Sequence, residues 1–293
     1  MTDNTATTES LREVAAQILS ENKVALVIGY ARNQGAPFST PVFVSNAEDV
    51  DQLLFNDLCF GNLSVYLPKD EIRSMGKTGI ILKGCDLRTV NVLLREHAIE
   101  REDLFLIGVR CGGVGNPTMG TMDTMEKCSV CDSHDPQGCD VVVGEPFEQP
   151  NTSEQERYSS VNEIEAKSLE ERWKFWERQL SSCIRCYACR QVCPLCYCKR
   201  CIADKTTPRW VESSAHLHGN LAWNAARAFH LAGRCVGCGE CERVCPMGLP
   251  LGAINQKMAK LVEEWFDFRS GLSVQEQAPF TTFSTDDVET DIL

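Results

Sequence analysis

Two cysteine runs with the same spacing constrain this chain more than any other feature of its sequence. Each run reads C-x2-C-x2-C-x3-C followed by proline, and the cysteines are Cys183, Cys186, Cys189 and Cys193 in the first run and Cys235, Cys238, Cys241 and Cys245 in the second. Thiolates two residues apart bring three ligands to one cubane iron–sulfur cluster, and the fourth cysteine, before the proline, binds the other cluster. The spacing therefore predicts two adjacent [4Fe–4S] clusters.

The crossed pattern also predicts which cysteines share a cluster. We call cluster I the one expected at Cys183, Cys186, Cys189 and Cys245, and cluster II the one expected at Cys235, Cys238, Cys241 and Cys193. A pair of zinc ribbons is the alternative for such a chain. It fits less well, because zinc sites usually pair two C-x2-C knuckles and do not need the third and fourth cysteine of each run.

Length, charge and cysteine count limit the setting and the partners. The chain has 293 residues, enough for two domains, and 17 cysteines. Residues 1–22 contain acidic residues and no apolar signal core, so we expect a cytoplasmic, reducing compartment in which clustered cysteines bind metal, and such clusters favour an anaerobic host. A membrane span is not expected because no run approaches about 20 apolar residues. The net charge of −12 argues against nucleic acid as a partner.

The first half of the sequence has an α/β pattern. A strand over 79–83, a helix capped by Asp86 and running to about residue 97, and a strand over 104–109 form a βαβ unit, which implies a parallel sheet. We expect the other elements of this half to be helices over 9–21, 49–56 and 69–75 and strands over 24–28, 42–44, 64–67 and 140–144.

Four further cysteines belong to this sheet pattern. Cys85 and Cys111 follow two parallel strands, at the edge where ligands bind in open α/β sheets, and Cys128 and Cys131 form a C-x2-C pair on a later loop. A third iron–sulfur site is one interpretation, and two buried thiols beside a small zinc knuckle is the other. Cys139 is a possible substitute ligand, and Cys59 is expected to be a buried thiol.

The second half is expected to be a mainly α-helical dicluster domain of bacterial ferredoxin type. We divide the chain into an α/β domain over 1–145, a linker over 146–162, the dicluster domain over 163–270 and an acidic flexible tail over 271–293. Helices are predicted over 162–180, 213–232 and 250–266, the last with Ile254, Met258, Leu261 and Trp265 on one stripe.

Three surplus cysteines open the 41-residue insert, residues 194–234, between the two runs. Cys196, Cys198 and Cys201 are structural thiols in one interpretation. In a second they bind an additional metal with His216 or His218, and in a third they are alternatives to Cys193.

Short motifs in the α/β part resemble a known family. The segments KGCDLR at 83–88, GVRC at 108–111, CSVC at 128–131 and DVVVGE at 140–145 resemble the FrhB/FdhB family, the beta subunits of deazaflavin-reducing hydrogenases and formate dehydrogenases. The resemblance covers roughly residues 60–145. It implies that Cys85, Cys111, Cys128 and Cys131 bind a cluster beside an FAD. The C-terminal half is similar to the dicluster modules of anaerobic reductases, including sulfite-reductase-A-like electron carriers and hydrogenase beta subunits.

These features together predict an electron-transfer subunit of a multi-subunit anaerobic oxidoreductase, not catalytic alone. Its partners would be flavoprotein or iron–sulfur subunits. Lys83 and Arg110 are the candidate cofactor-binding cations, because positive charge there favours a reduced cluster or a flavin anion. Two alternatives stay open: a flavoenzyme that reduces a deazaflavin or nicotinamide itself, and an α/β docking scaffold beside a sulfite-reductase-A-like electron carrier.

Overall fold

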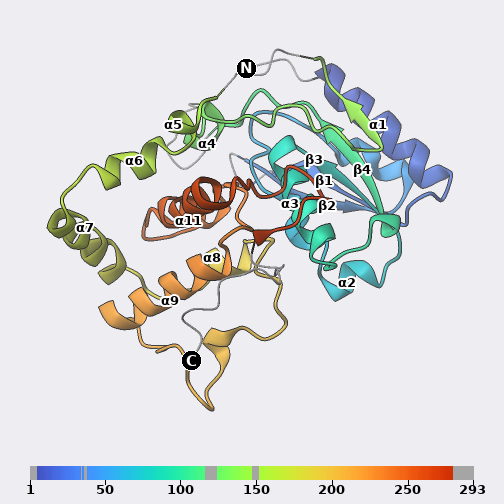
Figure 1. Ribbon diagram of the computed structural model, residues 1–293. Coiled ribbons are helices and arrows are strands. Elements are labelled where there is room, and N and C mark those ends of the chain that lie inside the picture. Colours follow the sequence, from blue (N-terminus) through green and yellow to red (C-terminus); the bar gives the residue numbers. More distant parts are fainter. Residues whose placement is uncertain (1–4, 34, 36–37, 116–123, 147–151, 280–293) are drawn as a thin grey trace.

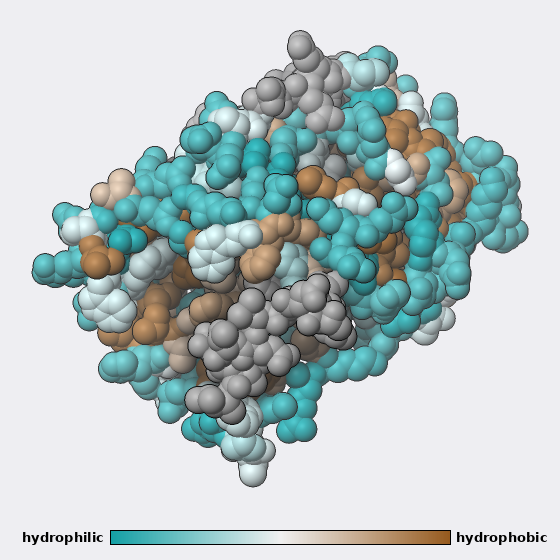
Figure 2. All heavy atoms as spheres, in the orientation of Figure 1, coloured by the Kyte–Doolittle hydropathy of each residue, from teal (hydrophilic) through white to brown (hydrophobic). Residues whose placement is uncertain are grey.

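The computed structural model describes residues 5–33, 35, 38–115, 124–146 and 152–279 of the chain. We call the described residues up to 146 the sheet region and residues 152–279 the cluster region. The two regions lie side by side, with the helix α11 (Leu251–Phe266) facing the sheet region (Figure 1). Hydrophilic residues cover most of the face seen in Figure 2, and hydrophobic side chains are exposed between them.

A five-stranded sheet of order β2-β1-β3-β4-β5 organises the sheet region. Its strands are β1 (Leu26–Arg32), β2 (Ser39–Val44), β3 (Thr78–Leu82), β4 (Leu104–Val109) and β5 (Val141–Val143). β2 runs antiparallel to β1, and the other three pairings are parallel, which confirms a mainly parallel α/β sheet. The central strands are near-continuous apolar runs because both of their faces are covered.

Helices complete the sheet region. They are α1 (Thr5–Ser20), η1 (Ala47–Gln52), η2 (Leu63–Tyr66), α2 (Asp70–Arg73), α3 (Gly84–Arg95), η3 (Arg101–Asp103) and α4 (Glu126–Ser129). Leu11, Ala15, Ile18 and Leu19 are the buried face of α1. α3 links β3 to β4, as the βαβ pattern predicts, and therefore begins and ends beside the carboxyl and amino edges of the sheet.

The cluster region contains α5 (Glu154–Arg157), α6 (Ser159–Glu165), α7 (Leu169–Ser181), α8 (Ala188–Gln191), η5 (Ile202–Asp204), α9 (Leu217–His230), α10 (Glu240–Arg243) and α11. The helix predicted over 213–232 is α9. Residues 154–165, inside and just after the expected linker, are helical and attach to α11 through three ion pairs: Arg157–Glu263 and Lys260–Glu165, both at 2.6 Å, and Lys257–Glu165.

Local hydrogen bonds explain two predictions that are wrong. A strand is expected over 64–67, but Leu63–Tyr66 form η2, because the Asn62 side chain accepts from the Ser64 amide at 3.1 Å and starts a tight turn. Asp86 is not the N-cap of α3. It lies one turn inside the helix and accepts from the backbone amide of Lys83 at 3.2 Å.

One further prediction in the cluster region is also wrong. The helix expected over 162–180 is two helices, because Ser168 caps α7 and its hydroxyl accepts from the Glu171 amide. The helix predicted over 250–266 is α11, and from its apolar stripe Ile254 and Met258 pack against apolar clusters while Trp265 is 70% exposed. The fully buried residues of α11 are Leu251, Ala253, Asn255 and Val262. The buried face of α11 includes the polar Asn255 because it faces the cysteine-lined interior described below.

The two regions share one apolar core. Leu195, Leu231 and Val236 of the cluster region are buried in the same cluster of side chains as the sheet. At the surface of this junction Glu96 accepts from Arg234 at 2.7 Å and from Tyr197 at 2.8 Å. Part of the expected tail also belongs to the junction, since the Gly271 carbonyl accepts from Asn91 and Ala278 is buried; residues 280–293 lie outside the described residues.

A buried charged network lies beneath the start of α3. The ammonium of Lys83 pairs with the Asp86 carboxylate at 2.8 Å, donates to the Gly61 carbonyl at 2.8 Å and contacts the Tyr30 hydroxyl. Both charged side chains are at most 2% exposed. Burial opposes the charged form of Lys83, but Asp86, Tyr30 and Cys85 together outweigh burial, so the pKa of Lys83 is raised.

Replacing one partner of the Lys83–Asp86 pair should strongly destabilise the fold. We expect Asp86→Ala to lower the free energy of unfolding by about 3–5 kcal/mol, because it leaves a buried ammonium without its carboxylate. Urea unfolding under anaerobic conditions, followed by circular dichroism, measures the change. Glu170→Ala is the matched control, since its ion pair with Lys174 lies on the surface and should change stability by about 0.5 kcal/mol or less. Equal losses in both variants would contradict the prediction.

Candidate iron–sulfur centres

The four cysteines expected at cluster II line one cavity of about 950 Å³, and they are Cys193, Cys235, Cys238 and Cys241. Burial raises the pKa of Cys235, of Cys238 and of Cys241, the last to about 12. Burial therefore disfavours a free thiolate at these positions, and a bound, positively charged centre would stabilise it.

The cysteines expected at cluster I lie next to that cavity. Cys183, Cys189 and Cys245 pack in one apolar cluster of side chains with Cys241, and Cys245 also lines the large cavity. Cys186, the fourth, is exposed. Burial raises the pKa of Cys189. The two predicted ligand sets are therefore adjacent, and cluster I is the set that reaches the surface.

Matching positions of the two cysteine runs share an unusual backbone. In the second run Gly237 and Gly239 have φ of 71° and 73°, the left-handed conformation that glycine adopts without strain. In the first run the equivalent residues are Arg185 and Tyr187, with φ of 58° and 60°. Side chains with a β-carbon are strained there, so contacts elsewhere must hold the first run in shape.

The insert supplies those contacts. The Arg185 guanidinium is buried and donates to the carbonyl of Gly219 at 2.6 Å, to that of Glu212 at 2.8 Å and to the Tyr187 hydroxyl at 3.0 Å. The Tyr187 ring packs edge-on against Trp223 of α9 with centroids 5.0 Å apart. We infer that the insert braces the loop around cluster I, a role that spacing alone did not predict.

Amide groups hydrogen-bond to several candidate ligand sulfurs. The Asn255 side chain donates to Cys241 Sγ at 3.5 Å, and the backbone amides of Leu249 and Ser133 donate to Cys245 Sγ and Cys131 Sγ, both at 3.4 Å. Such bonds stabilise negative charge on sulfur and adjust cluster potentials.

A buried guanidinium provides the clearest test of whether an anionic cluster fits here. Arg227 of α9 is buried, its Nε has no hydrogen-bond partner among the described residues, and a second nitrogen donates to the Cys189 carbonyl at 3.3 Å. Burial opposes its charge, but the surrounding Cys241, Cys193 and Cys189 sulfurs keep its pKa raised. A buried cation among the sulfurs of both cysteine sets suits two negatively charged clusters.

The third set also converges. Cys85, Cys111, Cys128 and Cys131 line one small pocket together with Lys83 and His134. Cys85 lies in the first turn of α3 after β3, and Cys111 follows β4, so both lie at the carboxyl edge of the sheet as predicted. The imidazole of His134 is hydrogen-bonded to the carbonyls of Cys111 at 2.7 Å and Cys131 at 2.9 Å, and so ties two of the four together.

Close backbone contact fixes the loop that brings these cysteines together. A β-carbon at Gly84 would lie 1.7 Å from the Ser133 carbonyl oxygen, so only glycine fits where the loop crosses α3. Cys139 is outside this pocket and packs against Gly108, and burial raises its pKa to about 12. Cys59 is fully buried, as expected.

The described residues contain no group of three or more His, Cys, Asp or Glu side chains arranged to hold a single metal ion. His216 instead caps α9 by accepting from the Gly219 amide at 3.3 Å. Thiolates on separate corners of a cubane need no such convergence.

The surplus cysteines occupy different environments. Cys196 hydrogen-bonds with Cys193, which raises the pKa of Cys193 and lowers that of Cys196. Cys198 is exposed, and Cys201 packs in the apolar cluster around cluster I. Cys196 therefore lies beside a predicted ligand of cluster II, and Cys201 packs near the predicted ligands of cluster I.

The two candidate cofactor cations are engaged by the protein. Lys83 lines the third pocket but its ammonium is occupied by the buried network beneath α3. Arg110 pairs with Asp135 at 3.2 Å and donates to the Gly144 carbonyl at 2.8 Å, and it lines neither cavity. Sequence reasoning missed the cations Arg227 and Lys127, which do line the large cavity, because an isolated Arg or Lys carries no spacing signal.

The fold and its cysteines define an iron–sulfur protein that joins a mainly parallel α/β sheet to a dicluster domain. Residues 182–250 match the family described as "4Fe-4S dicluster domain". The chain is similar to the F420-dependent formate dehydrogenase subunit beta of Methanocaldococcus jannaschii, with 35% identity over 111 residues, 38% of this chain and 27% of the relative. It is also similar to the F420-dependent formate dehydrogenase 1 subunit beta of Methanococcus maripaludis, with 23% identity over 329 aligned positions, 82% of this chain and 84% of the relative.

These comparisons confirm the predicted dicluster domain and the resemblance to formate dehydrogenase beta subunits. The aligned part spans about a quarter of the M. jannaschii relative and most of the M. maripaludis one. None of the helices in the described residues is long and apolar enough to cross a membrane.

Two substitutions at Arg185 test the bracing role of the insert. Arg185→Ala and Arg185→Gly both lose the bonds to the insert, so both should release iron to a chelator faster than the wild type. The loop around cluster I should be destabilised by about 1–2 kcal/mol more in Arg185→Ala than in Arg185→Gly, because only glycine adopts the left-handed conformation without strain. Bleaching of the iron–sulfur absorbance with time measures the release. Wild-type rates in both variants would mean that the insert does not hold this loop.

Proposed function

We propose that this chain is an iron–sulfur electron-transfer subunit of a cytoplasmic, multi-subunit oxidoreductase of the formate dehydrogenase type. One observation carries the proposal. Cysteines of the third set, Cys85, Cys128 and Cys131, line the same 950 Å³ cavity as all four cysteines of cluster II. Adjacent cubane sites can exchange single electrons, and three such sites in sequence would form a path through the chain.

The burial and exposure of the cysteines order the three sites from the interior to the surface. The third set lies at the edge of the buried sheet, cluster II lies in the junction, and cluster I lies at the surface through Cys186. Apolar residues flank that exposed end, with Ile184 54% exposed and Met247 45% exposed. We propose that cluster I is the point where electrons pass to or from the neighbouring protein of the complex.

The residues of this chain would do four things for the clusters. Cysteine thiolates would bind iron, amides of Asn255 and Leu249 would hydrogen-bond to sulfur, Arg227 would balance negative charge, and the apolar core would exclude water. When bound, each cluster supplies a one-electron carrier that needs little rearrangement. The domain division at residues 145 and 163 is part of the same proposal, with the shared core as the contact between domains.

Direct reduction of a deazaflavin or nicotinamide by a bound FAD is the second candidate. Beyond its cysteines the large cavity is lined by Arg157, Ser160 and Lys167, a polar extension that a flavin could occupy. Lys83 and Arg110 would not be its main contacts, since both are engaged elsewhere. Flavin released from purified chain by denaturation, with turnover in the absence of a partner, would favour this candidate.

Iron content tests the number of clusters. Anaerobically purified chain should contain about twelve irons, and Cys128→Ala should lose about four of them, because it removes a ligand of the third site. Cys59→Ala is the matched control, since that thiol is buried but outside both cavities. A wild type with about eight irons, or a Cys128→Ala variant that keeps all its iron, would support a scaffold role for the sheet region.

Electron delivery tests the function itself. Proteins that copurify anaerobically with this chain should include a catalytic oxidoreductase, and that enzyme together with its substrate should reduce this chain. Cys186→Ser should abolish the transfer if cluster I is the contact point, whereas Cys198→Ser, another exposed cysteine, should leave it intact. Transfer that survives loss of cluster I would contradict the proposed direction.

A further inference from the structure

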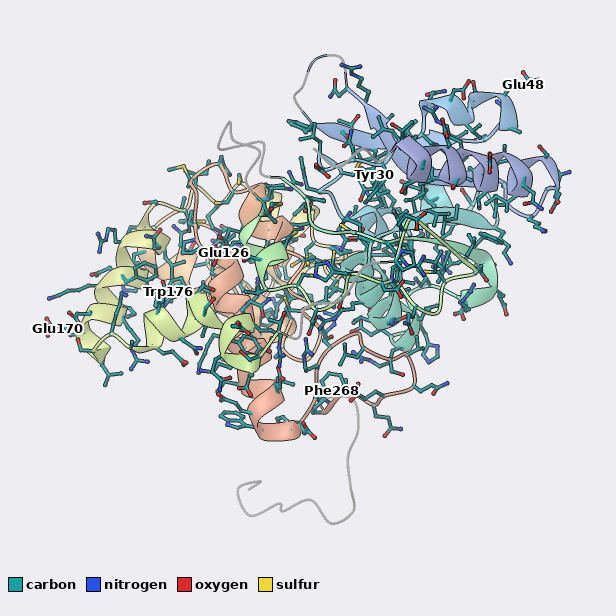
Figure 3. All side chains as sticks on the ribbon, turned by 90° about the horizontal axis from the view of Figure 1, so that it is seen from above. Tyr30, Glu48, Glu126, Glu170, Trp176 and Phe268 are labelled. Carbon is teal, nitrogen blue, oxygen red and sulfur yellow. The ribbon has the colours of Figure 1, made fainter. Side chains whose placement is uncertain are left out.

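One lysine side chain joins the third cysteine set to cluster II. Lys127 of α4 is bonded through the backbone to Cys128, and its Nζ donates to the Cys238 carbonyl at 2.7 Å. Lys127 lines both the small pocket of the third set and the large cavity of cluster II. Figure 3 shows its neighbour Glu126 beside α11 of the cluster region, whereas Tyr30 lies in the sheet region.

The lysine is packed into this position along its whole length. Its side chain is 13% exposed. Its Cδ would lie 3.2 Å from a β-carbon at Gly239, so the left-handed glycine of the second cysteine run also leaves room for the lysine stem. A side chain held at both ends has one position, and its charge is therefore fixed relative to both cysteine sets.

The charge of Lys127 is incompletely balanced by carboxylate. Its ion pair is with Glu240 at 3.9 Å, and Glu240 is paired more closely with Arg243, at 2.7 Å. A buried ammonium needs negative charge nearby. The sulfurs of Cys85 and Cys238, one from each set, lie near this ammonium, as does the ammonium of Lys83, and the two sulfurs would carry negative charge as cluster ligands.

We propose that Lys127 is a positioning residue that couples the third site to cluster II. This inference rests on the proposed function, because it requires a cluster at the third set. One cation close to two anionic clusters stabilises the reduced form of both. The covalent step from Cys128 to Lys127, followed by the hydrogen bond to Cys238, also gives a continuous bonded connection between the two ligand sets.

Lys127→Met tests the coupling, because methionine keeps most of the stem and removes the charge and the donor. We expect full iron content and a fall of about tenfold in the equilibrium constant for one-electron reduction of both the third site and cluster II. That change corresponds to about 59 mV for each site. Cluster I, which Lys127 does not contact, should keep its potential. Potentiometric titration followed by electron paramagnetic resonance measures all three.

Two further variants separate charge from packing. Lys127→Arg keeps the charge and should keep both potentials within a factor of about two of the wild type. Lys174→Met removes an exposed surface lysine and should shift nothing. If Lys127→Met does not assemble its clusters, the same potentials are measured in Lys127→Gln. Glutamine has an N–H donor for the Cys238 carbonyl but no charge.

The outcomes distinguish this inference from the proposed function. Unchanged potentials in iron-replete Lys127→Met, or in Lys127→Gln where methionine fails, overturn the coupling, and so does a shift confined to one of the two sites when both are present. A wild type with about eight irons overturns the three-site path instead, and with it the coupling; a shift in cluster II alone would then identify Lys127 as a residue of that cluster.

Discussion

Negative charge on closely spaced sulfur is the constraint on which the rest of this structure depends. Cysteines of the three sets line or adjoin two neighbouring cavities, where thiolates are poorly solvated. Buried cations lie at the junctions between the sets: Arg227 lies between the sets of clusters I and II, and Lys127 lies between cluster II and the third set. Lys83 lies behind the third set and is paired with Asp86. Arg227 comes from an element outside both cysteine runs that it faces, and Lys127 reaches cluster II from another part of the chain, so these charges meet only in the folded chain.

The two cysteine runs solve the same backbone problem in different ways. The second run places glycine at both left-handed positions and needs no outside support, which leaves space for Lys127 to lie over Gly239. The first run has Arg185 and Tyr187 at these positions, and their contacts with the insert offset the backbone strain. The strained run is also the one that reaches the surface at Cys186. Rigidity at that position comes from side-chain contacts, and these can be changed without altering the ligands.

Spacing and periodicity predict the parts of this protein whose signal is local in sequence. The strand predicted over 104–109 has the same bounds as β4. The βαβ unit correctly places Cys85 and Cys111 at one edge of the sheet. Predictions fail where a tertiary contact decides. Asn62 starts the short helix η2 where a strand is expected over 64–67, and Ser168 divides the helix expected over 162–180 into two. Burial of the polar Asn255 on α11 likewise follows from its contact with Cys241. Arg227, Lys127 and His134 carry no motif at all, since each is defined by what it touches across the fold.

The continuous core between the sheet and the cluster region links assembly to iron. Leu195, Leu231 and Val236 complete the core of the sheet, and they are flanked in sequence by Cys193, Cys196 and Cys235. Iron bound at the proposed cluster II would therefore also hold in place the segments that complete this core. A newly made chain in an iron-starved cell would keep that interior open, with apolar surface accessible to chaperones and proteases. Supply of the metal would thus set the abundance of the protein as well as its redox competence.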